Sequence, residues 1–597
     1  MILIFGGTTE GRLAAEVCEQ AGKPFFYSTK SALQDVPLHN GQRLTGPMTA
    51  ADIERFCQDN SIEAIIDAAH PFAEGLHEAI ADSALPVIRL QRPPIQLPEG
   101  VTACSDWADA LSRLQADSPR CLLALSGVNT ISRLRPYWQT HATYFRILHR
   151  EESIAKAEAE GFPADRLLFY NDALTLPSQA EEETLMRQIG CDAIITKMSG
   201  ESGGFSAKVE AARALGIKVY AVMPPRTPAN WTYVTGRHGL RRAIERLVPA
   251  FFPLRTGLTT GACATAAVSA AMQSLLYGQL PEEAHFALPD GEVLTIPVET
   301  EAGGVATVTK DFSDDPDVTR GCRITARVRP TPSPSHEGGE SREGKARLSI
   351  VRFLHGEGVG RVTLPGLGIP VGEPAINHTP RQMMTDTVRS FTGQDIDITI
   401  SVADGEALAE RTFNHKVGVV GGISIIGTSG IVSPLSNEAF IESIGRELEV
   451  ARAIGCDAIG LASGKRGEEA LLQMEPSLRV VHYGNFIGES LKRAHKLGFH
   501  RAVIGIMLGK AVKLAEGHLD THSHKVAMNK EFLCEVAQSA GVENAKAIFD
   551  SITMARELWN LMPQAFFDRI HELCLQHCRS VFPNNDLQIH LICDSQA

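Results

Sequence analysis

The stretch "MILIFGGTTEGRLAAEVCEQAG" at residues 1–22 decides the fold of the first part of the chain. The apolar run Ile2–Phe5 predicts a buried strand, and glycines and threonines follow it directly. The next stretch, Arg12–Ala21, has its apolar residues at helical spacing. Glycines between a strand and a helix let the backbone approach an anion at the helix N-terminus. A tight turn without a ligand is the alternative, and the spacing alone leaves both open.

The alternation of short apolar runs and helical stretches continues to about residue 245. The further expected strands are Pro24–Tyr27, Ala64–Ala68, Val87–Leu90, Cys121–Leu125, Ala193–Thr196 and Val219–Val222. A second expected helix of this region is Ala207–Leu215. Strand–helix alternation predicts parallel sheets covered by helices on both faces. We therefore expect an α/β fold of two Rossmann-like half-domains, over about residues 1–118 and 119–248.

The composition bounds the kind of protein. A length of 597 residues predicts several domains, because single cores stop growing near about 250–300 residues. The net charge of −13, without a long basic run, argues against a nucleic-acid partner. No run approaches the roughly 20 apolar residues of a membrane helix, so we expect no membrane partner. The twelve scattered cysteines predict reduced thiols and a cytoplasmic protein.

Two prolines, Pro249 and Pro253, predict a short connector before the second part, residues 254–597. Residues 254–415 read as an α+β subdomain with strands such as Val305–Val308 and Arg347–Phe353. Within it, the polar insertion at 330–346 has too little apolar surface to order itself.

From residue 416 the strand–helix alternation returns, which predicts a Rossmann-like α/β subdomain over 416–597. Its expected strands are Val417–Val420, Ala458–Leu461, Arg479–His482 and Ala502–Ile506. Its expected helices include Glu438–Ala453 and Phe486–Leu497.

Two loops of the first part suit a dinucleotide or a polycarboxylate ligand, because both follow a strand and offer glycines and hydroxyls. The first loop has Gly6, Gly7, Thr8 and Thr9, and the second, in "SGESGG", has Ser199, Gly200, Gly203 and Gly204. Lys197 and Lys208 flank the second loop as candidate substrate-binding cations. His70 follows another strand, in "DAAHPFAEGL", where a single histidine is more often structural than catalytic, and both roles stay open.

The motifs "GGTTEGRLAA", "DAAHPFA", "LALSGVNTI" and "ITKMSGESGGFSAKVEAARALGI" resemble the precorrin-6A reductase family of corrin biosynthesis across about residues 1–245. The resemblance implies a two-domain reductase that uses a nicotinamide cofactor on a corrin macrocycle. After the second expected strand no acidic residue is placed to hold a ribose 2′-hydroxyl, and Lys30 favours a 2′-phosphate. The family allows either NADPH or NADH, so the choice stays open.

The second part carries "LRTGLTTGACATAAVSAA", "DFSDDPDVTRG", "NHTPRQMM", "VGVVGGISIIGTSGIVSPLSNEAF", "NFIGESL" and "GKAVKLAEGHLDTHS". These motifs resemble the cobalt-precorrin-5B C1-methyltransferase family over about residues 254–590. The resemblance implies methyl transfer from S-adenosylmethionine to C1 of a cobalt-containing corrin precursor. It places the cofactor at the glycine-rich loop Gly421, Gly422, Gly427, Thr428 and Gly430. A buried strand pair with a tight turn is the alternative for that loop.

Several polar residues are candidates for the methyl-transfer site. Asp315 and Asp317 can stabilise developing positive charge or accept a proton, and an aspartate-rich turn is the alternative. His522, in "GHLDTHS", is a candidate donor to substrate carboxylates. The other candidate substrate-binding residues in the second part are Arg255, Thr259, Thr260, Arg381, Lys510, Thr521 and Ser523, with Lys513 beside them. Arg89 and Arg146 are further candidates in the first part. No metal site is expected, since Pro316 interrupts the aspartates and no calcium-loop glycine follows.

The chain therefore resembles a fusion of two consecutive enzymes, with the later enzyme first. We expect methylation of cobalt-precorrin-5B to cobalt-precorrin-6A, and then reduction to cobalt-precorrin-6B. One half that only binds corrinoids or serves as a scaffold is the alternative. A short connector between the halves favours direct handover of the intermediate, and independent enzymes that are only co-expressed are the alternative.

Overall fold

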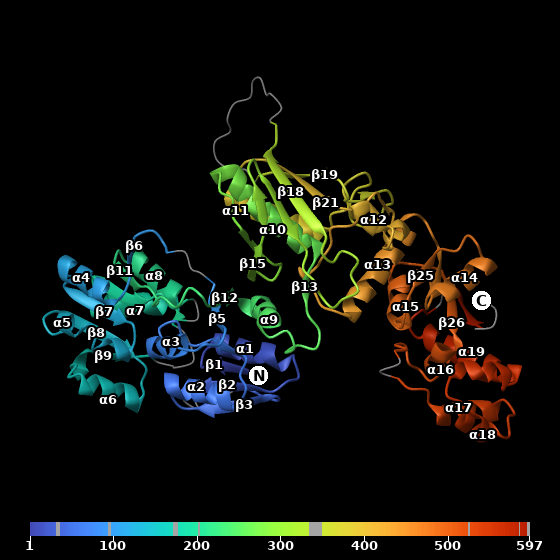
Figure 1. The fold of residues 1–597 in the computed structure, drawn as a ribbon, viewed down its shortest axis with the longest axis horizontal. Coiled ribbons are helices and arrows are strands. Elements are labelled where there is room, and N and C mark those ends of the chain that lie inside the picture. Colours follow the sequence, from blue (N-terminus) through green and yellow to red (C-terminus); the bar gives the residue numbers. More distant parts are fainter. Residues whose placement is uncertain are drawn as a thin grey trace. The chain divides into compact units, whose positions relative to one another are not determined.

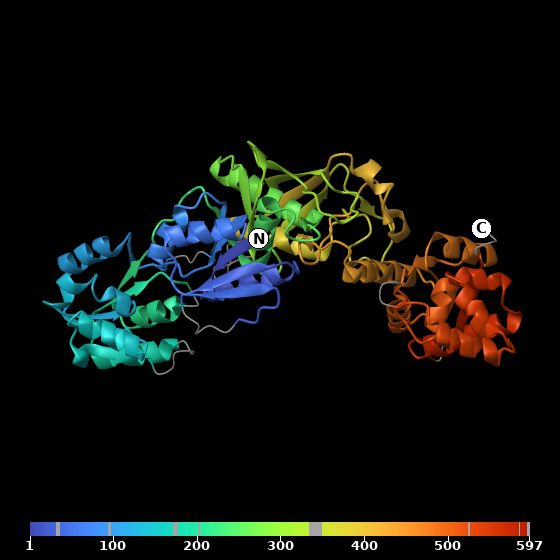
Figure 2. The same cartoon turned by 60° about the horizontal axis from the view of Figure 1, so that its bottom comes forward.

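A computed structural model describes residues 1–30, 36–93, 97–170, 177–200, 203–332, 349–522, 526–583 and 586–593. The chain forms two compact units (Figures 1 and 2). The first consists of Met1–Arg255 with Gly291–Thr295, and the second of Thr256–Asp290 with Ile296–Ala597. The architecture is mixed α/β with parallel sheets, as the alternation of strands and helices predicts.

The first sheet of the first unit has six parallel strands in the order β12-β5-β4-β1-β2-β3. These strands are β1 (Ile2–Phe5), β2 (Phe25–Thr29), β3 (Gly41–Thr45), β4 (Ala64–Asp67), β5 (Val87–Gln91) and β12 (Thr232–Thr235). The helices of this half are α1 (Thr9–Glu19), α2 (Ala50–Asp59), α3 (Glu74–Ala81) and α9 (Gly236–Leu247). The order of the strands reverses between β1 and β4, and ligands of such sheets bind at the carboxyl ends of the strands beside that reversal.

The second sheet of this unit is also six-stranded and parallel, in the order β6-β11-β10-β7-β8-β9. Its strands are β6 (Val101–Cys104), β7 (Cys121–Leu125), β8 (Ala142–Ile147), β9 (Leu167–Phe169), β10 (Ala193–Lys197) and β11 (Lys218–Val222). Its helices are α4 (Trp107–Asp117), α5 (Arg135–Trp138), α6 (Glu151–Ala159), α7 (Gln179–Ile189) and α8 (Phe205–Ala214). Here the strand order reverses between β7 and β10. Figure 1 shows the two sheets as separate groups of strands, each with its own helices.

The two halves do not divide near residue 118, which corrects the boundary expected from the sequence. β6 and α4 precede that residue but belong to the second sheet, where β6 pairs with β11. β12 and α9 come after the second sheet along the chain but belong to the first sheet, where β12 pairs with β5. The periodicity of a segment identifies it as a strand. Which sheet the strand joins depends on hydrogen bonds to strands that are distant in the sequence.

The expected connector at 249–253 is part of the core of the first unit. Phe251 and Phe252 are each only 4% exposed and pack in the core cluster of the first sheet. The guanidinium of Arg241 lies 4.3 Å from the centroid of the Phe252 ring. The change from one unit to the other therefore falls after Arg255.

The second unit begins with an α+β part. Its five-stranded sheet has the order β16-β17-β18-β21-β19, antiparallel except between β19 and β21. The strands are β16 (Glu299–Glu301), β17 (Val305–Thr309), β18 (Arg323–Pro330), β19 (Val351–His355) and β21 (Ile396–Val402). Helix α10 (Thr260–Tyr277) packs against β17, β18 and helix α11 (His378–Phe391). Figure 1 shows α10 beside β18 and α11. Its alanine-rich sequence suits this burial, because small side chains let a helix lie close to its neighbours.

Shorter elements complete this part. They are β13 (Gly257–Leu258), β14 (Glu283–Ala287), β15 (Val293–Pro297), β20 (Arg361–Val362), α12 (Gly405–Ala409), β22 (Val419–Val420) and β23 (Ile431–Val432). β13 pairs with β23, and β20 pairs with β22, both antiparallel. Of the polar insertion at 330–346, most falls outside the described residues.

The C-terminal part has a four-stranded parallel sheet in the order β25-β24-β26-β27. The strands are β24 (Ala458–Ala462), β25 (Val480–His482), β26 (Arg501–Met507) and β27 (Asp586–Ile592). The helices are α13 (Asn437–Ala453), α14 (Lys465–Met474), α15 (Ile487–Lys496), α16 (Leu508–Ala515), α17 (Lys530–Ser539), α18 (Ala545–Ser551) and α19 (Gln564–Arg579).

The expected strand Val417–Val420 does not belong to this parallel sheet. Only Val419–Val420 is a strand, and it pairs with β20 of the α+β part. The glycine-rich loop that follows it therefore belongs to the α+β part as well. A short apolar run before glycines fits either arrangement, so the sequence pattern could not decide between them.

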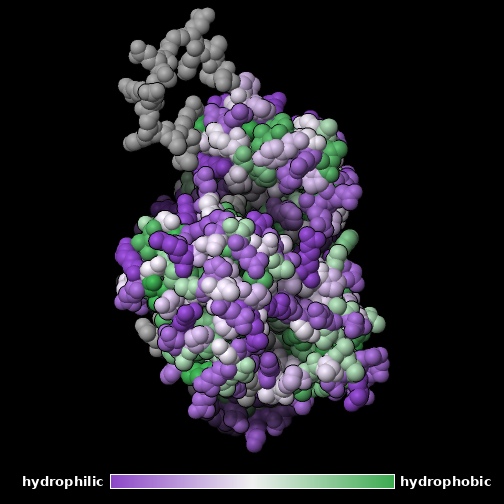
Figure 3. Space-filling model, turned by 90° about the vertical axis from the view of Figure 1, so that its left-hand side faces the viewer, coloured by the Kyte–Doolittle hydropathy of each residue, from purple (hydrophilic) through white to green (hydrophobic). Residues whose placement is uncertain are grey.

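None of the twelve cysteines, all of which lie among the described residues, forms a disulfide. Among the described residues, no helix is long and apolar enough to cross a membrane. The face drawn in Figure 3 has hydrophilic residues over most of its area, with hydrophobic residues in smaller groups between them.

Candidate active sites

The first glycine turn lies at the reversal point of the first sheet. Thr8 caps the N-terminus of α1, and its Oγ1 accepts a hydrogen bond of 3.0 Å from the backbone N–H of Gly11. The same hydroxyl donates to the carbonyl oxygen of Ala68, at 2.6 Å. The turn after β1 and the loop after β4 are thus joined by one side chain.

The glycines of this turn have different roles. A Cβ on Gly6 would lie 2.3 Å from the Tyr27 hydroxyl, and one on Gly11 would lie 2.7 Å from the Cα of Gly6. These two glycines are therefore required for close packing of strand, turn and helix. Gly7 differs, since its φ is +92° and a Cβ there would meet no atom within 4 Å. The space beside Gly7 is open, at the N-terminus of a helix, where an anion is stabilised.

The second glycine loop lies at the reversal point of the second sheet, after β10. Gly200 and Gly204 have positive φ values of 83° and 67°, and Gly204 precedes α8 without a side-chain cap. A Cβ on Gly203 would lie 2.0 Å from the Ser199 hydroxyl. Lys208 is buried, and its ammonium donates to the Gly203 carbonyl at 2.8 Å. Burial lowers the pKa of Lys208 to about 8. The structure thus uses Lys208 to hold the loop.

His70 lies in the loop that Thr8 contacts. Its Nδ1 accepts a hydrogen bond of 3.1 Å from the backbone N–H of Phe72. Desolvation, followed by the charges of Arg92 and Lys197, lowers the pKa of His70 to about 4. The residue reaches solvent, which screens these charges, but both effects favour the neutral ring. A neutral imidazole at pH 7 can donate and accept hydrogen bonds, but it is not a cationic acid.

Lys197 is a half-buried cation at the carboxyl end of β10. Its Nζ lies 5.3 Å from the centroid of the Phe72 ring and 6.0 Å from that of the Trp107 ring. Burial lowers its pKa. Within the described part of the chain, no carboxylate lies at ion-pair distance from it. A cation near two aromatic rings suits a flat ligand that carries carboxylates.

Two arginines that the sequence suggested for substrate carboxylates are instead used inside the fold. Arg89 pairs with Asp67 at 2.8 Å, and Asp67 also contacts Nδ1 of His77 at 2.9 Å. Arg146 pairs with Glu182 at 3.1 Å. All of these side chains are at most 8% exposed, so the prediction that Arg89 and Arg146 contact substrate is wrong.

Sequence reasoning missed Arg92 and Glu10. The guanidinium of Arg92 makes two contacts of 3.1 Å with the Glu10 carboxylate, in the first glycine turn. A third nitrogen of Arg92 donates to the Ser199 carbonyl, in the second glycine loop. Glu10 stands inside the motif "GGTTEG", which was a signal for it, but nothing local to Arg92 indicates its partners.

In the second unit, the turn "TGLTTG" packs against the glycine loop of residues 421–430. Thr259 caps α10 and donates its backbone N–H to the Gly430 carbonyl at 3.0 Å. The backbone N–H of Ile426 donates to Oγ1 of Thr260 at 2.9 Å. A Cβ on Gly427 would lie 2.3 Å from Oγ1 of Thr259. Both threonines are at most 9% exposed, so they join two segments of the fold.

The glycine loop keeps some accessible positions. Gly430 is buried, with a φ of +82°, and a Cβ there would lie 2.5 Å from Leu288. Gly422 packs against Gly358 in the same way. Gly421 is exposed, with a φ of +79° and no atom within 4 Å of a built Cβ, and Thr428 is exposed.

The aspartate loop is anchored on both sides. The Asp317 carboxylate forms an ion pair of 2.8 Å with the ammonium of Lys310, whose side chain is 1% exposed. It also accepts hydrogen bonds from the backbone N–H and the hydroxyl of Thr319. Burial raises the pKa of Asp317, but Lys310 and the hydrogen bonds outweigh it, so the pKa is lowered overall. The Asp315 carboxylate accepts a hydrogen bond of 3.1 Å from the backbone N–H of Leu435. Leu435 has a left-handed φ of +57° and is 70% exposed. The aspartate loop therefore lies beside Leu435, five residues after the end of the glycine loop of residues 421–430.

The last two motifs meet at the carboxyl ends of the C-terminal sheet. Lys510 donates to the Gly484 carbonyl, and burial together with the Lys513 charge lowers its pKa to about 8. The backbone N–H of Thr521 donates to the Asn485 carbonyl at 3.0 Å. The backbone N–H of His522 donates a hydrogen bond of 3.2 Å to the Asp520 carboxylate. Ser523 lies outside the described residues.

The two remaining arginine candidates have different surroundings. Arg381 pairs with Glu373 at 2.7 Å and donates to the carbonyls of Ile376 and Pro374. Its donors are thus largely engaged in the α+β part. Arg255 is the last residue of the first unit before the chain enters the second.

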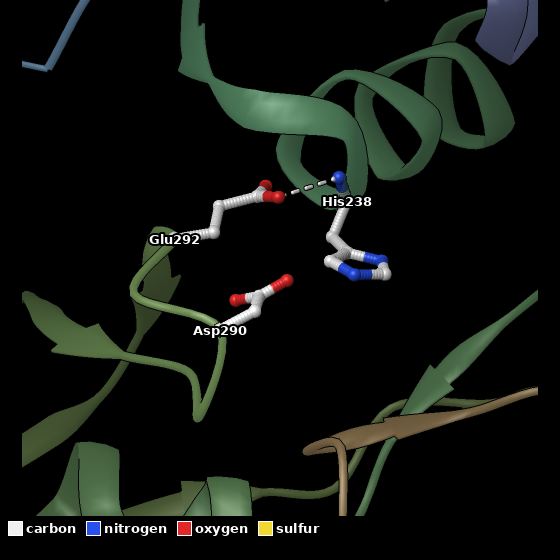
Figure 4. A group of neighbouring side chains, drawn as sticks. All are labelled: His238, Asp290 and Glu292. Atoms are coloured by element: carbon white, nitrogen blue, oxygen red, sulfur yellow. Dashed lines mark hydrogen bonds between the residues drawn. The ribbon is translucent and has the colours of Figure 1, made fainter.

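One further contact of the first unit lies at the N-terminus of α9. Glu292, in the turn between β14 and β15, accepts a hydrogen bond of 3.0 Å from the backbone N–H of His238 (Figure 4). It accepts a second, of 2.6 Å, from the backbone N–H of Gly239. This carboxylate caps the N-terminus of α9, where no side chain of the helix itself does so.

The fold and the two sets of loops define a chain of two joined α/β enzymes, one built on doubly wound parallel sheets. Residues 1–245 match the family model "Precorrin-6x reductase CbiJ/CobK", and residues 250–434 match the family model "CbiD". The chain belongs to the cobalt-precorrin-5B C(1)-methyltransferase family, and the segment ahead of that part is similar to the precorrin-6x reductase family. Both resemblances inferred from the motifs are confirmed.

Relatives of the second part are numerous. The cobalt-precorrin-5B C(1)-methyltransferase of Prosthecochloris aestuarii is 40% identical over 57% of this chain and 94% of its own length. The enzyme of the same name from Geobacillus sp. strain WCH70 is 38% identical over 54% of this chain and 88% of its own length.

Two solved structures are also similar. The Archaeoglobus fulgidus cobalamin biosynthesis protein (cbiD) is 28% identical over 46% of this chain and 83% of its own, with a TM-score of 0.25. A CobK precorrin-6A reductase is 22% identical over 41% of this chain and 97% of its own, with a TM-score of 0.34.

Proposed function

We propose that the chain catalyses two consecutive steps of corrin-ring biosynthesis. The second unit methylates cobalt-precorrin-5B at C1 and forms cobalt-precorrin-6A. The first unit then reduces this product to cobalt-precorrin-6B with NADPH or NADH. The observation that supports the proposal is that two predicted glycine loops lie at the reversal points of the two parallel sheets, in a chain whose residues 1–245 and 250–434 match the two family models.

The residues of the first unit fit a nicotinamide dinucleotide. The open space at Gly7 and the capped N-terminus of α1 suit a pyrophosphate. The nicotinamide supplies a hydride to one carbon of the double bond, and the other carbon takes a proton. Lys197 binds a carboxylate of the macrocycle, while the rings of Phe72 and Trp107 contact its apolar parts. Lys197 is also the candidate proton donor, because its pKa is lowered and His70 is neutral.

The residues of the second unit favour a charge-stabilising role for Asp317. S-adenosylmethionine supplies the methyl group, and the ring carbon that receives it acquires positive character. A carboxylate with a lowered pKa stays ionised, which stabilises that charge and makes it a weak proton acceptor. Asp315, on the same loop, is the candidate acceptor for a proton, and His522 stays a candidate donor to substrate carboxylates.

Gly421 and Thr428 are exposed positions of the glycine loop, and we propose that S-adenosylmethionine contacts them. Thr428→Val keeps the shape and removes the hydroxyl, so a calorimetric titration should show weaker binding. Ser443→Ala, on an exposed turn of α13, is the matched control. Unchanged affinity in Thr428→Val and in Gly421→Ala would remove the loop from the cofactor site.

One incubation tests both activities. The full chain is mixed with cobalt-precorrin-5B, S-adenosylmethionine and NADPH, and the products are identified by mass. A gain of one methyl group followed by two hydrogens supports the proposal. A methyl gain without reduction would leave the first unit as a binding or scaffold module.

Handover of the intermediate is a separate part of the proposal. The incubation is repeated with an isotopically labelled methyl donor and an excess of unlabelled cobalt-precorrin-6A. Under direct handover, the first cobalt-precorrin-6B carries the label without dilution. Full dilution by the added pool would show that the intermediate is released before reduction.

A further inference from the structure

We propose that Arg92, held by Glu10, is a positioning residue that fixes the two glycine loops of the reductase unit relative to each other for hydride transfer. This inference rests on the proposed reduction. It concerns the geometry between the bound cofactor and the macrocycle rather than the affinity for either.

The contacts of Arg92 use its guanidinium in three directions. Nε and Nη2 each lie 3.1 Å from a different oxygen of Glu10, which is the bidentate arrangement of an arginine–carboxylate pair. Nη1 donates to the backbone carbonyl of Ser199. A Cβ on Gly200 would lie 2.9 Å from Cδ of Arg92, so the aliphatic stem also lies against the second loop.

The three segments that Arg92 connects come from different places in the sequence. Arg92 follows β5, Glu10 is in the first turn of α1, and Ser199 follows β10. The first loop lies at the reversal point of one sheet and the second at that of the other. Arg92 therefore joins the carboxyl edges of both sheets within the first unit.

The pair is mostly shielded from water, with 13% of the Arg92 side chain and 15% of the Glu10 side chain exposed. Shielding strengthens the electrostatic attraction, and the planar fork fixes direction as well as distance. A lysine in the same place could not make all three contacts, because its ammonium is a single point of charge.

The chemistry of the site explains why such a fixture matters. If the cofactor lies on the turn at Gly7 and the macrocycle at Lys197, the donor and acceptor of the hydride are held by different sheets. A displacement of about 1 Å between reacting groups can reduce a rate by about 100-fold. The Arg92 contacts set this displacement, because they are made to both loops at once.

The experiment compares binding with turnover in the full chain. Arg92→Gln and Glu10→Gln are tested for NADPH affinity by calorimetry and for the rate of cobalt-precorrin-6A reduction at saturating NADPH. We expect kcat to fall by about 10- to 100-fold, with the NADPH Kd changed by less than about 3-fold. Arg92→Lys should recover part of the loss, since it keeps the charge but not the fork. Arg120→Gln, which removes an ion pair with Asp192 at the opposite edge of the second sheet, is the matched control.

The methylation rate of the same preparations reports on the rest of the chain and should not change. A kcat within about twofold of the unsubstituted value in both Arg92→Gln and Glu10→Gln would overturn the inference. A parallel loss of kcat, NADPH affinity and thermal stability would also overturn it, because it would indicate a merely structural ion pair. If Arg92→Gln does not fold, Arg92→Lys and Glu10→Gln decide the question. Absence of reduction by the unsubstituted chain would contradict the proposed function instead.

Discussion

The chain has two glycine–threonine turns of similar sequence, "GGTTEG" at 6–11 and "TGLTTG" at 256–261. Their structural environments differ. In the first turn, Gly7 opens onto free space and Thr8 connects two loops of one edge. In the second, both threonines are buried and hydrogen-bonded to the loop of residues 421–430. A ligand can reach the first turn directly, whereas the second turn positions another segment.

The difference shows what a glycine means in each turn. Gly6 and Gly11 are required by close packing, and so are Gly261 and Gly427. Among the glycines of these two turns, Gly7 alone combines a positive φ with open space at a helix N-terminus, which is where a phosphate would bind. A glycine-rich motif therefore predicts close backbone approach, while the approaching group is decided by the neighbouring segments.

The largest expected effect is at Lys310, which secures the aspartate loop beside the second turn. Lys310→Met leaves the Asp317 carboxylate without its buried partner. Removing one member of a buried ion pair costs about 3–5 kcal/mol of the free energy of unfolding. Urea denaturation should show this loss in the second unit. Lys465→Met, on an exposed lysine of α14, is the control and should change stability little.

Gly261→Val should destabilise the second turn. The built Cβ lies 2.5 Å from Cγ of Pro380 and 3.0 Å from the Ile426 carbonyl, so the helix and the glycine loop must separate. Overpacking of a core costs about 1–3 kcal/mol. Thermal denaturation should show a lower Tm, with NADPH binding by the first unit unchanged. An unchanged Tm would mean that the turn is less closely packed than described.

Gly7→Val should act on binding more than on stability. The strain of a positive φ costs about 1–3 kcal/mol, and the side chain would occupy the space proposed for the pyrophosphate. NADPH affinity, measured by calorimetry, should fall by at least about 10-fold. Gly22→Val is a matched control, because Gly22 also has a positive φ, of 61°, and open space around a built Cβ. Equal losses of affinity in both variants would contradict a cofactor site at Gly7.

Acidification should distinguish the second unit through Asp317. Its folded pKa is lowered below the usual value of about 3.9, so the ionised form stabilises the fold. This contribution is present above about pH 4 and is lost as the pH falls through the folded pKa. Asp317→Asn should therefore be less stable than the natural sequence at pH 7, and the difference should shrink toward pH 3. A difference that does not depend on pH would exclude this linkage.

The smallest expected effect concerns the choice of cofactor. Lys30 is exposed and directly follows β2, and residues 28–30 at the end of that strand include no carboxylate. Lys30→Ala should lower the preference for NADPH over NADH by up to about 10-fold, since one charge contact with a 2′-phosphate is lost. Rates with the two cofactors measure this. A strong preference for NADH in the unsubstituted chain would show that Lys30 does not set the choice.

Local patterns predicted much of the fold. The strands at 2–5 and 121–125 were predicted to the residue, and β4, β10, β24 and β26 within one residue at either end. The predictions failed where pairing joins distant segments. The half-domain boundary was wrong because β6 and β12 each pair across it, and Val419–Val420 pairs with β20 outside the parallel sheet.

The candidate sites divide in the same way. The sequence indicated the glycine loops because backbone freedom is a local property, visible in consecutive residues. It could not indicate that Arg89 and Arg146 are buried in ion pairs, since their partners lie 22 and 36 residues away. For the same reason Arg92 was missed, because its partners Glu10 and Ser199 lie 82 and 107 residues away.

The sequence by itself determined the families, the alternation of strands and helices, and the turns where the backbone can approach a ligand. These features depend on neighbouring residues, whose periodicity and chain conformation are set locally. Only the tertiary structure decided which strands share a sheet, which charges are neutralised inside the fold, and which glycine faces open space. Those outcomes depend on contacts between segments far apart in the chain, and no local pattern encodes their partners.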